Sequence, residues 1–319
     1  MPLLDLPLSD LQAYTGRNPR PPDHDAYWER ALAELSDTAL AVDLVPAEFQ
    51  APAAECFHLF FTGVRGARIH AKYLRPRQAA APHPAVLLFH GYTGSSGDWS
   101  DKLAWVARGF SVAALDCRGQ GGWSEDRGGS RGTTHHGHII RGLEDHEDNL
   151  LYRQIFLDTA ALARIVMNLP EVDEGRVGAA GASQGGALAL ACAALEPRIR
   201  RASSVYPFLC DYQRVWEMDL AKHAYAELRT FFRHHDPTHA REVEWFTRLG
   251  YIDIQFLAPR IQADVLMGVG LMDDVCPPSS QFAAYNKIRA TKRTIVFPDF
   301  AHEQLPGYAD AQYDFLGGL

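Results

Sequence analysis

Residues 176–195 read RVGAAGASQGGALALACAAL, a pattern typical of a strand, a tight turn and a helix. Val177–Ala180 is short and apolar, and the Ala-rich run after Gly185 has high helix propensity. Between them GASQG (residues 181–185) matches the G-x-S-x-G pattern of a nucleophile elbow. Such a turn lifts the serine hydroxyl out of the fold, and the flanking glycines let strand and helix approach closely. The stretch predicts that Ser183 is a nucleophile; the alternative is a tight turn with a solvated serine.

The rest of the chain alternates buried strands with helices. Continuous apolar runs predict strands at Ala85–Phe89, Ser111–Leu115, Ala202–Tyr206, Val265–Val269 and Thr294–Phe297. Helical spacing predicts helices at 99–109, 143–169, 279–290 and 309–316. This alternation predicts an α/β fold with a mostly parallel central sheet and helices on both faces. In such sheets ligands bind at the carboxyl ends of the strands, so candidate residues should follow strand ends.

We expect residues 1–319 to form a single domain, with residues 1–45 as an N-terminal capping segment that includes a helix at Asp25–Leu35. Alternating residues in 55–75 predict a β-hairpin at a sheet edge. Residues 208–259 form a long, aromatic-rich connection, which we interpret as a helical insertion before the carboxylate-bearing loop. It should overhang Ser183, narrow access to the site and contribute to subunit contacts; the alternative is an internal cap.

Composition excludes several classes of protein. The chain has 319 residues, 47% of them hydrophobic, and a net charge of −8, which does not suit nucleic acid binding. The N-terminus lacks a basic region, and no apolar run approaches the roughly 20 residues that span a bilayer. The five cysteines include no C-x-x-C pair. We therefore expect free thiols in a reducing cytoplasm, with no membrane partner.

A nucleophilic serine needs a histidine base, which in turn needs an orienting carboxylate. His302 follows the last predicted strand directly, which makes it the candidate base. Asp273 and Asp274 follow the strand before it and compete for the carboxylate role. Asp299 shares the loop of His302, so it cannot easily reach the opposite side of the ring. The order Ser, Asp, His is that of the predicted fold, while the choice between Asp273 and Asp274 stays open.

Backbone N–H groups should stabilise the negative charge that develops on the attacked carbonyl. Gln184 opens the helix after the serine, so its N–H is unpaired, and Tyr92 lies in the loop after the strand that ends before His90. Other motifs are weak. The His135–His138 run lacks a carboxylate or cysteine at ligand spacing, and neither a dinucleotide nor a phosphate-binding glycine pattern occurs. We expect no metal and no cofactor.

Three motifs occur together: Arg118-Gly119-Gln120, the GASQG elbow and His302-Glu303. With them the chain resembles carbohydrate esterase family seven, the acetyl xylan esterases and cephalosporin C deacetylases. Further matching segments extend the resemblance over nearly the whole chain; they are residues 137–145, 152–153, 156–159, 276–279 and 282–286. Ala182 is a minor departure, because many relatives have Gly before the serine.

The resemblance implies an α/β-hydrolase fold and the removal of acetyl groups from sugar esters and similar small acetates. It implies that Asp273 is the carboxylate of the triad, and that Arg118 and Gln120 brace the site. It also implies a homo-hexamer with active sites facing an internal cavity. Two other functions remain as alternatives: a peptidase or lipase-like esterase of the same fold, and a catalytically silent binding protein.

Overall fold

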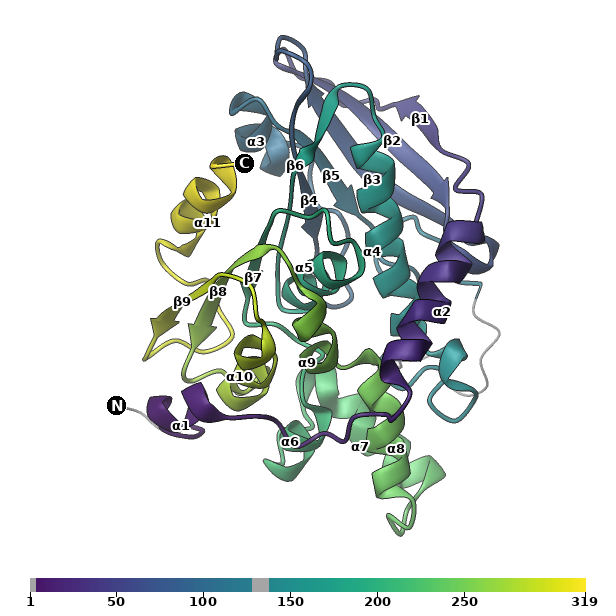
Figure 1. Ribbon diagram of the computed structural model, residues 1–319, viewed down its shortest axis with the longest axis vertical. Helices are drawn as coiled ribbons and strands as arrows, with labels where there is room; N and C mark the ends of the chain where they lie inside the picture. The colour runs from purple at the N-terminus through teal and green to yellow at the C-terminus, as the bar shows by residue number, and fades with distance from the viewer. Residues whose placement is uncertain (1–3, 128–137) are drawn as a thin grey trace.

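The computed structural model describes residues 4–127 and 138–319. In these residues one sheet runs through the molecule in the order β1-β2-β3-β5-β4-β6-β7-β8-β9 (Figure 1). Its strands are β1 (Asp43–Pro46), β2 (Ala54–Thr62), β3 (Arg68–Pro76), β4 (His83–Phe89), β5 (Ser111–Leu115), β6 (Val172–Ala182), β7 (Arg201–Val205), β8 (Asp264–Gly270) and β9 (Lys292–Phe297). All pairs from β5 to β9 are parallel, and β1 to β3 add an antiparallel end. The expected α/β architecture is confirmed.

Helices cover both faces of this sheet. Apolar side chains of α1 (Leu8–Ala13), α2 (His24–Asp37), α4 (Leu151–Met167), α5 (Gln184–Leu195) and α10 (Pro278–Lys287) pack on one face. The opposite face packs against α3 (Leu103–Ala107) and α11 (Tyr308–Gly317) (Figure 1). Helix α5 is buried along its whole length, which explains why only Ala, Gly, Leu and Cys follow its polar first residue. None of the described helices is both long and apolar enough to cross a membrane.

Two local expectations need correction. The hairpin formed by β2 and β3 lies one strand inside the sheet edge, because residues 43–46 pair with β2 and form the outer strand. The predicted helix over 143–169 begins only at Leu151. Gly142 has a φ of +84°, and a Cβ there would lie 2.2 Å from the carbonyl oxygen of Asn149, so a tight turn precedes the helix. Apolar spacing alone could not reveal this turn.

Residues 208–259 are helical, as the sequence predicts. They contain α6 (Tyr212–Glu217), α7 (Ala226–His235), α8 (Glu242–Leu249) and α9 (Ile254–Leu257). Aromatic side chains of this insertion join the main hydrophobic core; they include Phe208, Tyr212, Tyr225, Phe231, Phe232, Trp245 and Phe246. In Figure 1 the helices lie at the end of the molecule towards which β8 and β9 point. Short 3₁₀ turns occur at η1 (Val64–Gly66), η2 (Ser100–Lys102), η3 (Glu147–Asn149), η4 (His223–Tyr225), η5 (Gly250–Ile252) and η6 (Ala258–Arg260).

Hydrogen bonds hold the N-terminal segment against the insertion. The buried carboxylate of Asp211 accepts hydrogen bonds from the Tyr14 hydroxyl at 2.8 Å and from the backbone N–H groups of Arg17 and Asn18 at 2.9 and 2.7 Å. Asp5 accepts from the Arg214 guanidinium at 2.8 Å. In the described part, carboxylates that satisfy backbone and side-chain donors therefore hold the N-terminal segment against the insertion, and the capping role of residues 1–45 stays a prediction.

Candidate active site

Ser183 lies at the sharp junction between β6 and α5. Its backbone φ is +57° and its ψ is −120°, a region that a residue with a side chain rarely adopts. The surrounding glycines are needed for close approach: a Cβ on Gly181 would lie 2.4 Å from the Gly185 carbonyl carbon, and one on Gly185 would lie 2.0 Å from the Phe89 carbonyl oxygen. The strained turn predicted from GASQG is present.

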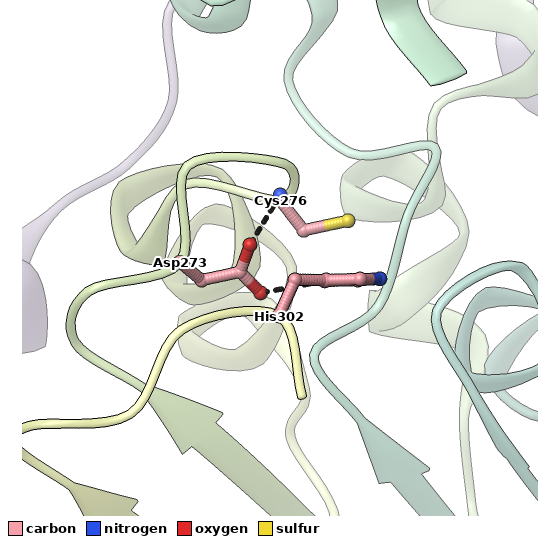
Figure 2. A group of neighbouring side chains, drawn as sticks. All are labelled: Asp273, Cys276 and His302. Atoms are coloured by element: carbon pink, nitrogen blue, oxygen red, sulfur yellow. Dashed lines mark hydrogen bonds and ion pairs between the residues drawn. The ribbon is translucent and has the colours of Figure 1, made fainter. Parts of the chain in front are cut away.

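His302, in the loop after β9, joins Ser183 to Asp273. Its Nε2 lies 3.1 Å from Ser183 Oγ, and its Nδ1 lies 2.9 Å from Asp273 Oδ2 (Figure 2 shows the second contact). A carboxylate can only accept, so Nδ1 carries the proton and Nε2 is free to accept from the serine hydroxyl. The structure thus brings together the three residues expected from separate strand ends.

Hydrogen bonds from its own loop hold the Asp273 side chain in position. Its side chain is fully buried, and Oδ1 accepts from the backbone N–H groups of Val275 and Cys276 at 2.9 and 2.7 Å. Neither competing carboxylate has this placement: Asp274 is half-buried and Asp299 is exposed, and the His302 imidazole pairs with Asp273. The hydrogen bonds leave Oδ2 directed at the imidazole, as Figure 2 shows.

The two expected donors of the oxyanion site are backbone N–H groups on neighbouring segments. Among the described residues, no acceptor pairs with the N–H of Tyr92 or of Gln184. Gln184 is the first residue of α5, where the helix leaves its N–H groups free and its dipole favours negative charge. Both N–H groups are therefore available to a negatively charged oxygen.

Gln120 contacts both of these segments. Its amide exchanges hydrogen bonds with the Gln184 amide, and its Oε1 also accepts from the Thr93 backbone N–H at 2.9 Å. Arg118 lies deeper, where its guanidinium donates to both oxygens of Asp158 at 2.5 and 2.7 Å. Arg118 and Asp158 are both about 1% exposed, so the pair is a buried, bidentate ion pair. Arg118 therefore contacts the core, whereas Gln120 contacts Thr93 and Gln184 directly, and the bracing role expected for both stays a prediction.

His90 contributes to the same loop. Its Nδ1 donates to the Gly91 carbonyl oxygen at 2.7 Å, and its Nε2 accepts from the Cys117 backbone N–H at 3.0 Å. Burial lowers the pKa of His90, so the ring stays neutral and can act as both donor and acceptor. The loop after β4 is thereby held to the loop after β5.

Three residues near the site escaped the sequence analysis. The Tyr206 ring centroid lies 4.4 Å from that of His302, just past β7. The Cys276 thiol points the same way as the Nε2 end of His302 (Figure 2), and burial raises its pKa. Glu227, from the insertion, accepts a hydrogen bond from the Tyr92 hydroxyl at 2.5 Å. Tyr206 follows a strand end and could have been found. Cys276 lies in a segment that carries the family resemblance, and nothing in the sequence pattern marked Glu227.

The site also contains a potential metal-ligand group. Asp273, Cys276 and His302 each offer an atom within 4.8 Å of the others. However, both Asp273 oxygens accept hydrogen bonds, and one of them orients the imidazole, so the geometry is that of a hydrogen-bonded relay. His135 and His136 lie outside the described residues. The described His138 packs edge-on against the Tyr92 ring, with centroids 5.2 Å apart.

Known proteins resemble this chain in both sequence and fold. The model of the acetyl xylan esterase (AXE1) family matches residues 1–319. The solved structure of acetyl xylan esterase 1 from Thermoanaerobacterium sp. is 58% identical and superposes with a TM-score of 0.97, over 98% of this chain and 99% of that one. An acetyl xylan esterase from Paenibacillus sp. is 34% identical with a TM-score of 0.92, over the same shares of the two chains.

Among curated proteins, the chain is 26% identical over 298 residues to acetyl esterase Axe7A of Xylanibacter ruminicola. The match covers 92% of this chain but 65% of that longer protein. The α/β-hydrolase fold and the resemblance inferred from the motifs are therefore both confirmed, and the chain belongs to the acetyl xylan esterase family.

Proposed function

We propose that the protein is a serine carboxylesterase that removes O-acetyl groups from acetylated xylo-oligosaccharides and similar small acetates, with cephalosporin C as a further substrate. The observation that carries the proposal is the continuous relay from Ser183 through His302 to Asp273, in a chain that belongs to the acetyl xylan esterase family. Ser183 is the nucleophile, His302 the general base and acid, and Asp273 the group that orients the imidazole.

In the first half of the reaction the Ser183 hydroxyl attacks the acetyl carbonyl carbon while His302 Nε2 takes its proton. The N–H groups of Tyr92 and Gln184 stabilise the resulting oxyanion. His302 then returns the proton to the sugar oxygen as the acyl bond breaks, and an acetyl-enzyme remains. Water, activated by the same imidazole, releases acetate and restores Ser183.

A cleft beside His302 supports a sugar as the alcohol half of the ester. Its volume is about 270 Å³, and its lining offers both rings and polar groups: Val205, Tyr206, Glu303, Gln304, Leu305, Tyr308, Ala309 and Gln312. Aromatic faces and amide or carboxylate groups suit the apolar faces and hydroxyls of a sugar. His302 must protonate the leaving alkoxide, so a cleft on its side is where that sugar would lie.

Rival functions differ in measurable ways. A silent binding protein would leave Ser183 unlabelled by a phosphonate ester although the protein is folded. For the main proposal we expect stoichiometric labelling that is lost in Ser183→Ala. A lipase-like enzyme would keep or gain kcat/KM from p-nitrophenyl acetate to octanoate. An acetyl-sized pocket predicts a fall, because each added methylene costs about 1–3 kcal/mol when packed side chains must move.

We further propose a cytoplasmic homo-hexamer of single-domain subunits whose insertion, residues 208–259, restricts the site to small acetates. The family resemblance supports the assembly, and the contact from the insertion to Tyr92 supports the restriction. Light scattering should give six times the 35.4 kDa chain mass, and acetylated oligosaccharides should be better substrates than polymeric acetylxylan. A monomer equally active on the polymer would refute both statements.

A further inference from the structure

Glu227 is a buried carboxyl group that the reaction outlined above does not use. It is the second residue of α7, in the insertion, and its exposed fraction is 4%. Its Oε1 accepts from the Tyr92 hydroxyl at 2.5 Å, and its Oε2 accepts from the backbone N–H groups of Ile139 and Ile140 at 2.8 and 3.0 Å. One side chain therefore joins three segments that are distant in sequence: the loop after β4, the turn before α4 and the insertion.

Tyr92 links this junction to the reaction, because its side chain contacts Glu227 and its backbone N–H belongs to the expected oxyanion site. Its ring packs edge-on against Phe208, with centroids 5.5 Å apart, and its hydroxyl donates a hydrogen bond to Glu227. Its backbone lies in a tight turn, closed by a 3.0 Å hydrogen bond from the Gly94 N–H to the Gly91 carbonyl. The neighbouring Thr93 has a φ of +61°. Because the turn is short and strained, the direction of the Tyr92 N–H depends on where the side chain is held.

We infer that Glu227 is a positioning residue for the esterase: by holding the Tyr92 phenol, it aims the Tyr92 backbone N–H at the oxyanion of the tetrahedral intermediate. The inference rests on the proposed function, since it concerns the same oxyanion site. Burial raises the pKa of Glu227 to about 8, and the hydrogen bonds from Tyr92 and from the N–H groups of Ile139 and Ile140 oppose that rise.

The test compares four variants of the full-length protein: Tyr92→Phe, Glu227→Gln, their combination and Asp236→Asn. Tyr92→Phe keeps the ring and the backbone N–H but removes the hydroxyl. Glu227→Gln keeps the side-chain volume, and its amide oxygen can still accept from the two backbone N–H groups. In that orientation the amide NH2 group, which cannot accept, faces the Tyr92 hydroxyl, so the hydroxyl loses its acceptor. Asp236 is the matched control, because this buried carboxylate of the same insertion accepts from the N–H groups of Ala240 and Arg241 and has no contact with Tyr92.

We expect kcat for p-nitrophenyl acetate to fall about 10-fold to 100-fold in each single variant at Tyr92 or Glu227, with KM changed less than about twofold, because a misdirected donor weakens only the transition state. The double variant should be no worse than the poorer single variant, since both break one contact. Affinity for a trifluoromethyl ketone, which forms an oxyanion on Ser183, should fall by the same factor as kcat/KM. Asp236→Asn should lower the melting temperature and leave kcat unchanged.

Three outcomes would overturn the inference. Glu227→Gln could leave kcat unchanged, the two losses could multiply in the double variant, or Asp236→Asn could lower kcat as much as Glu227→Gln does at equal loss of stability. A wild-type protein whose esterase activity does not depend on Ser183 would overturn the proposed function and this inference together. A wild-type protein that is active through Ser183, combined with a fully active Glu227→Gln variant, would overturn only the role of Glu227.

Discussion

The side-chain amides of Gln120 and Gln184 face each other through two hydrogen bonds. Gln120 Nε2 donates to Gln184 Oε1 at 2.7 Å, and Gln184 Nε2 donates to Gln120 Oε1 at 3.0 Å. The same Gln184 oxygen accepts from the Tyr152 hydroxyl at 2.7 Å. The loop after β5 is thus joined to the residue that follows Ser183.

Gln120→Glu should lower kcat about 10-fold, because the carboxylate can still accept from Thr93 but cannot donate to Gln184, so two acceptor oxygens face each other beside the site. Steady-state kinetics on p-nitrophenyl acetate would measure the effect. Gln50→Glu makes the same chemical change beside β2, where the Gln50 amide donates to the Ala47 and Cys56 carbonyls, and it should leave kcat unchanged. Equal kinetics in the two variants would contradict a role for Gln120 at the site.

Ser183→Ala should reduce kcat by about a million-fold, since the members of a triad act as one unit. Ser183→Gly should be equally inactive yet more stable than Ser183→Ala by about 1 kcal/mol, because glycine adopts a φ of +57° without strain. Chemical denaturation of the two variants measures this difference. A less stable glycine variant would show that the turn is not strained.

Asp273→Asn should lower kcat by about 10⁴-fold, because the amide stabilises the wrong imidazole tautomer. Asp274→Asn, one residue away and half-buried, should change kcat by less than about twofold. The pair is a matched test, as both changes remove one charge from the same loop. Should Asp274→Asn prove the more damaging, the assignment of the carboxylate is wrong.

Arg118→Met should destabilise the fold by about 3–5 kcal/mol, since it leaves the Asp158 carboxylate buried without its partner. Arg127→Met removes an exposed pair with Glu125 and should cost at most about 1 kcal/mol. Thermal unfolding measures both. At a temperature where the Arg118 variant is folded, its kcat should be closer to the wild-type value than that of Gln120→Glu; a larger kinetic defect would indicate direct participation of Arg118.

The stability of the wild-type protein should depend on pH through Asp253. Burial, and then the charge of Asp211, raise the pKa of Asp253 to about 7 in the folded protein. Because this value lies above the unfolded one, near 4, the contribution of the group is fully present below about pH 4 and is lost as the pH rises through about 7. Asp253→Asn does not titrate, so its unfolding free energy should fall less between pH 4 and 8. Parallel curves for both proteins would refute the coupling.

Much of the site could be predicted because it depends on the order of elements along the chain. Ser183, Asp273 and His302 each follow a strand whose apolar run is visible in the sequence, and the parallel sheet brings those strand ends together. The choice of Asp273 over Asp274 needed the family resemblance, because adjacent residues differ only in the direction of their side chains.

Other features could not be predicted because they depend on contacts across long separations in sequence. Glu227 lies 135 residues from Tyr92 in the sequence, and the spacing of apolar residues does not indicate that the two side chains are in contact. The outer strand β1 is only four residues long and carries no alternating pattern, so the hairpin of β2 and β3 seemed to end the sheet. The turn at Gly142 places the start of α4 at Leu151, and the spacing of apolar residues does not indicate this turn.

The carboxylate of Asp211 sets a constraint on the order of folding. Its partners at Tyr14, Arg17 and Asn18 lie 193–197 residues earlier in the chain, so during translation they leave the ribosome long before it does. Closing so long a loop is slow, because its entropy must be lost before the contacts form. The N-terminal segment should therefore dock late, and until it does the insertion should resemble a loosely attached lobe that chaperones or proteases can reach.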